Sequence, residues 1–153
     1  MMKEVPIQDL MPGVVQGVAV QLPSNQAGYR ESFFEWRASS LVAQFQKKEI
    51  SGGVLRSWHH TPEFDVIETH MDAEMFYFIS GVALMIFMDV EAGCPKVDSA
   101  QIVRIQPGTQ IIISAGKGHF VAVAEGDDPV SAIVISPRME APRIALPEGI
   151  AGI

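Results

Sequence analysis

Short apolar segments separated by turn-forming residues make up most of the chain. Ten such segments cover residues 13–20, 32–45, 52–58, 64–70, 74–80, 82–88, 100–105, 109–114, 119–125 and 130–136. The intervening stretches, such as 90–98 and 125–129, are rich in glycine, proline and aspartate, which favour turns. Short strands with turns about every 8–12 residues are typical of an all-β sandwich or barrel. We therefore predict an all-β sandwich or barrel.

One segment allows two interpretations. Residues 38–50 could form a helical turn, but their apolar positions alternate as much as they repeat every 3.6 residues, which favours a strand. The length of 153 residues fits a single domain, 1–153. Within it we expect residues 1–30 to form an N-terminal strand and arm. The proline- and glycine-rich residues 137–153 are expected to form an extended C-terminal tail.

Composition and charge exclude several classes of partner. The net charge of −7 and the absence of any basic run argue against a nucleic-acid partner. No stretch approaches the ~20 apolar residues of a membrane-spanning helix, so we expect no membrane partner. Cys94 is the single cysteine, which excludes an intrachain disulfide and a cysteine-based zinc site. Together with an N-terminus that lacks a signal-peptide pattern, this favours a cytoplasmic location.

Residues of metal-binding type interrupt the predicted strands. Side chains in 64–70 alternate between two faces, so Glu68 and His70 point the same way. Glu74 follows a tight turn, and His119 opens a later strand after a glycine-rich turn. These two imidazoles and two carboxylates form a nitrogen and oxygen set that suits Zn²⁺, Mn²⁺, Fe²⁺ or Ni²⁺. The sequence therefore predicts a divalent metal site at Glu68, His70, Glu74 and His119.

The same four residues also have a purely structural interpretation. Glu68 could face solvent on an edge strand, and Glu74 adjoins a turn, where acids are common. The two histidines could be hydrogen-bonded core residues. A buried polar group is costly unless a partner satisfies it, so the surroundings of these side chains decide between the interpretations.

The spacing of these residues resembles the two motifs of the cupin superfamily. His70-x3-Glu74-x6-Gly81 is similar to the second half of the first motif. Gly108-x5-Ser114-x-Gly116-x2-His119 is similar to the second, with Ser114 where cupins usually have proline. The resemblance covers roughly residues 50–136. It implies a cupin-type double-stranded β-helix that holds one divalent metal through Glu68, His70, Glu74 and His119. The usual first motif begins His-x-His, where this chain has Glu68-x-His70.

Among cupins, the chain resembles the ureidoglycolate lyase family of allantoin breakdown, which has Glu-x-His in the first motif. The N-terminal region is also similar, with Asn25, Gln26 and Arg30 at the matching polar positions. The chain departs from that family in three ways. His59 and His60 stand where the family has an arginine-containing loop, Gly118 replaces a tryptophan, and Glu74 accompanies the Glu-x-His pair.

This resemblance implies a lyase that splits ureidoglycolate, a small acid, into glyoxylate and urea. Proton transfer would fall to Glu68, Glu74, His59 or His60. Arg30 or Arg56 would bind the substrate carboxylate. Two alternatives stay open: a non-catalytic cupin that binds a small ligand, and a cupin sugar isomerase or dioxygenase.

Cupins commonly dimerise, and we therefore expect a homodimer that buries more than about 1,000 Å² in total. The apolar residues 13–20 and the C-terminal tail are the segments expected to cover the partner.

Overall fold

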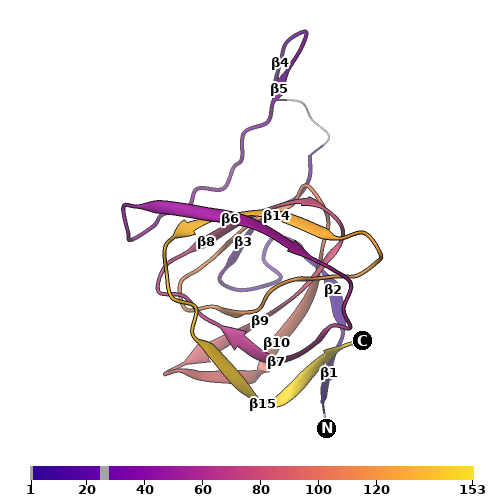
Figure 1. The fold of residues 1–153 in the computed structure, drawn as a ribbon, viewed down its shortest axis with the longest axis vertical. Helices are drawn as coiled ribbons and strands as arrows, with labels where there is room; N and C mark the ends of the chain where they lie inside the picture. Colours follow the sequence, from indigo (N-terminus) through magenta and orange to yellow (C-terminus); the bar gives the residue numbers. More distant parts are fainter. Residues whose placement is uncertain (1, 25–27) are drawn as a thin grey trace.

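The computed structural model describes residues 2–24 and 28–153, which form fifteen strands (Figure 1). None of these residues forms a helix long and apolar enough to cross a membrane. The strands are β1 (Lys3–Val5), β2 (Ile7–Asp9), β3 (Val18–Gln21), β4 (Tyr29–Arg30), β5 (Glu35–Trp36), β6 (Ile50–Ser57), β7 (Glu63–Glu68), β8 (Glu74–Ser80), β9 (Ala83–Glu91), β10 (Cys94–Ile105), β11 (Gln110–Ile113), β12 (Gly118–His119), β13 (Val123–Ala124), β14 (Val130–Pro137) and β15 (Arg143–Gly152).

Two sheets face one another. The larger has the order β1-β15-β7-β12-β9-β10-β2, with β13 beside β9, and the smaller has the order β3-β11-β8-β14-β6. From β6 to β15 the chain crosses repeatedly between these sheets, although β9 and β10 follow one another within the larger one. This is the arrangement of a cupin-type jelly roll, and the predicted all-β fold is confirmed.

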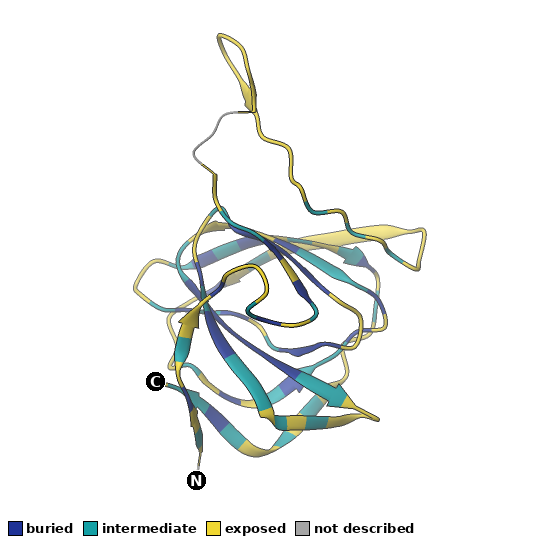
Figure 2. Ribbon diagram, turned by 180° about the vertical axis from the view of Figure 1, so that it is seen from behind, coloured by how far each residue is buried: buried dark blue, intermediate teal, exposed yellow. Residues whose placement is uncertain are grey.

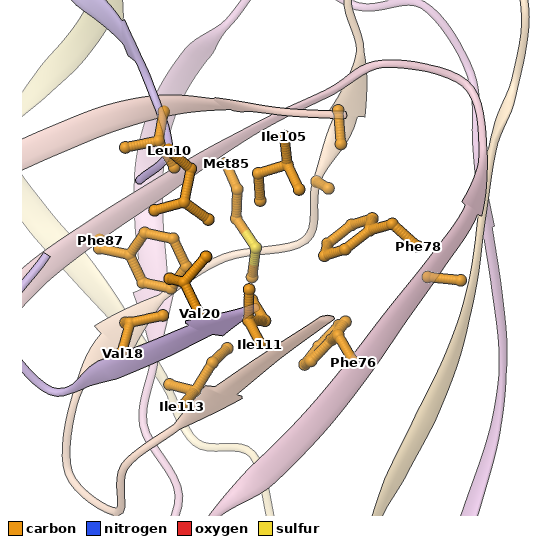
Figure 3. Packing of buried hydrophobic residues seen from close by; sticks show 14 of the residues in the cluster. Leu10, Val18, Val20, Phe76, Phe78, Met85, Phe87, Ile105, Ile111 and Ile113 are labelled. Atoms are coloured by element: carbon orange, nitrogen blue, oxygen red, sulfur yellow. The ribbon is translucent and has the colours of Figure 1, made fainter. Parts of the chain in front are cut away.

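The main core fills the space between the sheets. Alternate residues of β9, Met85 and Phe87, point inward from the larger sheet, and Phe76 and Phe78 of β8 point inward from the smaller one. Figure 3 shows Met85 in the middle of this cluster, with Ile111 among the side chains around it. The period of two along each strand thus divides core from outer positions, as the apolar pattern predicts.

The larger sheet also closes around a second, smaller core. Only Pro6 separates β1, which pairs with β15, from β2, which pairs with β10. β1 and β2 are the two end strands of the larger sheet, and the chain itself joins them. The sheet therefore closes into a ring, which occupies the lower half of Figure 1. Ile67, Ile86 and Ile102 are among the buried residues that fill this ring. Both faces of β9 are consequently buried.

An arm leaves the barrel between β3 and β6. Figure 2 shows it as an exposed loop that ends in the β4–β5 hairpin, well away from the two sheets. Residues 37–49 belong to no sheet in the described chain, so the strand predicted over 38–50 is wrong except for Ile50. Leu41, Ala43 and Phe45 do alternate with more exposed neighbours, but no strand pairs with them.

The segments at the two ends of the chain take part in the barrel. Residues 143–152 of the predicted tail form β15, which pairs with β7 and, in parallel, with β1. In the N-terminal region, Val15, Val18 and Val20 are buried in the main core. These valines therefore offer no free surface for a partner.

Candidate metal centre

Strands of both sheets bring the predicted ligands to one place in the barrel. Glu68 is the last residue of β7, His70 lies in the turn that follows, and Glu74 is the first residue of β8. In β12, His119 is the direct cross-strand partner of Glu68. Because paired residues on adjacent strands share a face, the side chains of Glu68 and His119 enter the same space.

The polar atoms of these residues converge closely. The Oε2 atom of Glu74 lies 3.0 Å from Nε2 of His119 and 3.1 Å from Nε2 of His70. Glu68 approaches from the other side, with Oε1 at 3.7 Å from Nε2 of His70 and 4.0 Å from Nε2 of His119. One ligand atom from each of Glu68, His70 and His119 can be chosen so that all lie within 4.8 Å of one another.

Backbone carbonyl groups orient both imidazole rings. The Nδ1 atom of His70 lies 3.2 Å from the carbonyl oxygen of Glu140, and Nδ1 of His119 lies 2.9 Å from that of Lys117. A carbonyl can only accept, so each Nδ1 carries the proton and each Nε2 faces the carboxylates. Lys117 is itself held by Asp89, whose Oδ1 is 2.6 Å from its Nζ. A hydrogen bond from the outer ring nitrogen is the usual support for a metal-binding histidine.

These separations fit ligands that surround one ion. Two atoms each about 2.1 Å from an ion are about 3.0 Å apart at right angles and about 4.2 Å apart when opposite. The four separations above fall in that range. The buried Nε2 of His70 also lacks a well-aligned hydrogen bond to any described residue, despite its short contact with Glu74. An unsatisfied nitrogen that faces two carboxylates is suited to bind a cation, so the donor set fits a divalent metal.

Without a metal ion, the carboxylates of the cluster favour a protonated imidazole. The carboxylates of Glu68 and Glu74 raise the pKa of His70 to about 10, although burial opposes this. Burial alone would raise the pKa of Glu74, but the hydrogen bonds and charges of His119 and His70 outweigh it and lower the pKa to about 2. The site therefore attracts positive charge, which either a proton or a metal ion can supply.

A small cavity adjoins the cluster. It has a volume of about 170 Å³ and reaches the side chains of Glu68, Glu74 and His119. The rest of its lining is apolar and comes from both sheets: Leu55, Phe76, Met85, Phe120, Val121 and Val134. No arginine or lysine is among the described residues that line it. The carboxylates and imidazole thus form the polar part of a mainly apolar chamber.

The other predicted site residues lie elsewhere. His59 is exposed, with Nδ1 at 3.2 Å and 3.0 Å from the carbonyl oxygens of Ala124 and Glu125, and His60 is exposed beside it. Arg56 is exposed on β6, where its neighbour Leu55 takes the position that faces the cavity. None of these three residues lines the cavity.

Arg30 is the one N-terminal polar position among the described residues, and it lies in the arm, away from the cluster. Its Nη1 atom is 3.9 Å from a carboxylate oxygen of Glu35. Asn25 and Gln26 lie outside the described residues.

Sequence reasoning missed the residue that fixes the turn between the ligands. The carboxylate of Asp72 is buried and accepts hydrogen bonds from the backbone N–H groups of Gln46, Lys47 and Ala73 at 2.9–3.0 Å. Burial opposes ionisation, but these N–H groups lower the pKa of Asp72. The turn that carries His70 and Glu74 is thereby tied to the base of the arm. An aspartate in a tight turn was the available signal, but its partners Gln46 and Lys47 lie 26 and 25 residues earlier in the chain.

Gly118 has a packing role beside His119. A Cβ atom at this position would lie 2.8 Å from Cδ1 of Ile67 and 2.9 Å from Cγ2 of Val90, both closer than real contacts allow. The short strand β12 can therefore fit between β7 and β9 because residue 118 has no side chain.

Comparison with known proteins gives matches among solved structures but none among family models or curated proteins. No family model matches the sequence, and no curated protein matches it. A solved structure of Bacillus subtilis oxalate decarboxylase that concerns its Mn(II) centres aligns with 63% of this chain at 20% identity and a TM-score of 0.45. The structure of the same enzyme at pH 4.6 gives the same three values.

The alignments cover only 24% and 23% of those two chains, so this protein matches about a quarter of their length. The assignment of the fold therefore stands on the strand order of this chain, and the candidate metal centre stands on the geometry of its own residues.

Proposed function

We propose that this protein is a metal-dependent cupin enzyme. Its substrate is a small molecule whose oxygen atoms can bind the metal ion. The observation that carries the proposal is the arrangement of His70 and His119. Both rings are oriented by backbone carbonyls, and both Nε2 atoms face two carboxylates beside a cavity. When bound, a divalent ion would supply Lewis-acid polarisation of a substrate oxygen.

The cavity limits the substrate. Its volume of about 170 Å³ is well below the roughly 300–1,000 Å³ of pockets for drug-sized ligands. Leu55, Phe120 and Val134 surround the substrate with apolar surface and exclude water from the polar end. With no arginine or lysine among its described lining residues, the cavity leaves the charge of an acid substrate to be balanced at the metal centre.

Ureidoglycolate is the specific substrate that we propose to test first. The Glu68-x-His70 pair, which resembles the ureidoglycolate lyase family, and the size of the cavity support this choice. In the reaction a base takes the hydroxyl proton, the carbon–nitrogen bond breaks, and its electron pair remains on nitrogen, which takes up a proton to release urea and leave glyoxylate. Glu68 is the candidate base, because its carboxylate lines the cavity and stands farther from the imidazoles than that of Glu74.

The decisive experiment combines metal analysis with an assay for glyoxylate. Purified protein is depleted of metal, reloaded with Mn²⁺, Zn²⁺, Fe²⁺ or Ni²⁺ in turn, and mixed with ureidoglycolate. We expect stoichiometric metal and glyoxylate release that depends on it. In Glu68→Gln the metal should remain and the release should fall by about 10²-fold or more. Bound metal without glyoxylate release would reject the lyase and leave the metal-binding site intact.

The same assay separates the alternatives that belong to other classes. A non-catalytic binding cupin would take up metal and a small ligand without chemical change, which mass spectrometry of the recovered ligand would show. Failure to bind any divalent ion, with the fold intact, would reject the metal-dependent enzyme altogether.

A further inference from the structure

The arm, defined as residues 28–49, exposes large apolar side chains that its own barrel leaves uncovered. Phe33 is 84% exposed, Trp36 65% and Val42 81%. The β4–β5 hairpin pairs only two residues on each side, and a hairpin of that size is not stable alone in water. Figure 1 shows the hairpin at the end of the arm, beyond the barrel. The arm thus has the composition of a segment that packs against another surface, but the barrel does not cover these side chains.

A matching surface lies on the outside of the smaller sheet. Tyr77 of β8, Ile133 of β14 and Val54 of β6 are direct neighbours in one row across three strands. They are 43%, 45% and 77% exposed. The outer side chains Ile79 and Ile135 of the same strands are 50% and 38% exposed. The solvent side of an antiparallel sheet is normally polar, so this outer face, defined by these five residues, is an unusual apolar surface.

Arm and outer face are adjacent in the chain and compatible in charge. The arm leads directly into β6, which is an edge strand of the smaller sheet. Residues 28–49 hold four basic and three acidic residues, which leaves seven basic and fifteen acidic residues in the rest of the chain. A slightly basic arm therefore meets a strongly acidic barrel without repulsion.

The arm also stands off its own barrel. An open hollow of about 690 Å³ separates the two and is lined by Trp36 and Arg37 on one side and by Tyr77 on the other. Space for other atoms therefore lies between the arm and Tyr77 of the outer face.

We propose that the arm of one copy packs on the outer face of a second copy, and the reverse, in a twofold homodimer. Aromatic side chains bury roughly 150–250 Å² each, so the exposed fractions amount to on the order of 1,000 Å² of apolar surface per copy for the arm and outer face together. A twofold pair would bury on the order of 2,000 Å², which reaches the size of stable interfaces. The reciprocal contact is of the kind that a twofold axis generates.

The test uses the full chain and three variants in sedimentation experiments at micromolar concentrations. The arm variant carries Phe33→Ser and Trp36→Ser, and the face variant carries Val54→Lys. Ile153→Ser removes an equally exposed apolar side chain elsewhere and serves as the matched control. We expect a dimer for the wild type and the control. The arm and face variants should each raise the dissociation constant by about tenfold or more. Circular dichroism checks that each variant is folded.

Mixing the two variants distinguishes arm exchange from any other dimer. A heterodimer of arm variant and face variant keeps one intact contact, between the wild-type arm of one chain and the wild-type face of the other. We expect the mixture to associate more tightly than either variant alone. The proposal is overturned by a monomeric wild type, by a dimer that the arm variant leaves unchanged, or by a mixture with no gain in association.

Discussion

Glu74 and His119 belong to strands of opposite sheets, yet their Oε2 and Nε2 atoms lie 3.0 Å apart. Glu74 continues the inward row of Phe76 and Phe78 on β8, and His119 is the cross-strand neighbour of both Glu68 and Phe87. The candidate metal centre therefore joins the two sheets at the end of the core, where apolar packing gives way to polar contacts.

The first prediction concerns the histidine of the larger sheet. His119→Ala should abolish or strongly reduce metal loading while the protein stays folded, because no other side chain of β12 replaces the lost nitrogen. The remaining cavity is polar and can admit water. Metal content after dialysis against Mn²⁺ or Zn²⁺ gives the result. His60→Ala, which changes an exposed histidine outside the cavity, is the matched control, and unchanged loading in His119→Ala would reject the site.

The second prediction separates the two carboxylates. Glu74 contacts both Nε2 atoms at 3.0 and 3.1 Å, whereas the nearest approaches of Glu68 are 3.7 and 4.0 Å. We expect Glu74→Gln to weaken metal affinity by at least about 100-fold and Glu68→Gln to weaken it less. Titration calorimetry measures both. The reverse order would exchange the roles of ligand and base between them.

The third prediction places a defect beside the centre without touching a ligand. In Gly118→Ala the new methyl group would press on Ile67 and Val90 and displace β12. Overpacking of this kind costs about 1–3 kcal/mol. Both the midpoint of thermal unfolding and metal affinity should fall, since His119 moves with the strand. Gly126→Ala, where nothing lies within 4 Å of the added atom, should leave metal affinity unchanged. Equal effects of the two substitutions would contradict the packing role of Gly118.

How much of this could be read from the sequence depends on the range of the interactions. The alternation in 64–70 and the isolated His119 predicted the site residues that the fold brings together, because a strand period of two is a local property. The alternation in 38–45 is just as clear, yet no strand pairs there, since pairing depends on a partner that the pattern does not specify. The local pattern likewise does not predict that β1 and β2 close the larger sheet.

The lining of the cavity illustrates a second limit. Leu55, Met85 and Val134 have the same pattern as residues of the solid core, and only their position beside the carboxylates makes them part of a chamber. Arg30, through the family resemblance, and Arg56, through its chemistry, are candidates to bind the substrate carboxylate, but neither argument decides which arginine faces a site. The structure leaves both exposed outside it.

The fourth prediction follows from the ionisation of the metal-free protein. The folded-state pKa of His70 is raised to about 10 from 6.5, so its stabilising contribution is complete below about pH 6.5 and is lost as the pH rises toward 10. The folded-state pKa of Glu74 is lowered to about 2 from 4.5, so its contribution is present above about pH 4.5 and is lost as the pH falls toward 2. The pair therefore stabilises the fold most between about pH 4.5 and 6.5.

Thermal unfolding of metal-free protein, measured inside this window and on both sides of it, checks the prediction. The difference in unfolding midpoint between the wild type and Glu74→Gln should be largest inside the window and shrink on both sides. A constant difference from acidic to alkaline pH would contradict the predicted ionisation.

The fifth prediction concerns the buried carboxylate of the turn. Asp72→Asn keeps the size of the side chain but replaces one acceptor oxygen by a donor, which opposes the N–H groups of Gln46 and Lys47. The unfolding midpoint should fall, and proteolysis should cut residues 37–49 faster than in the wild type. Asp127→Asn, a surface change, is the control. Unaltered cleavage of this segment would show that Asp72 does not hold it.

Asp72 connects the exposed arm to the turn between two of the candidate metal ligands. Its carboxylate accepts hydrogen bonds both from the base of the arm and from the turn that separates His70 from Glu74. If a second copy orders the arm and a metal ion orders the turn, dimer formation and metal binding both depend on the hydrogen bonds of Asp72. Thermodynamic linkage then requires each to change the affinity of the other by the same factor. The dissociation constant of the dimer would then depend on the concentration of metal, and metal affinity would depend on the concentration of protein.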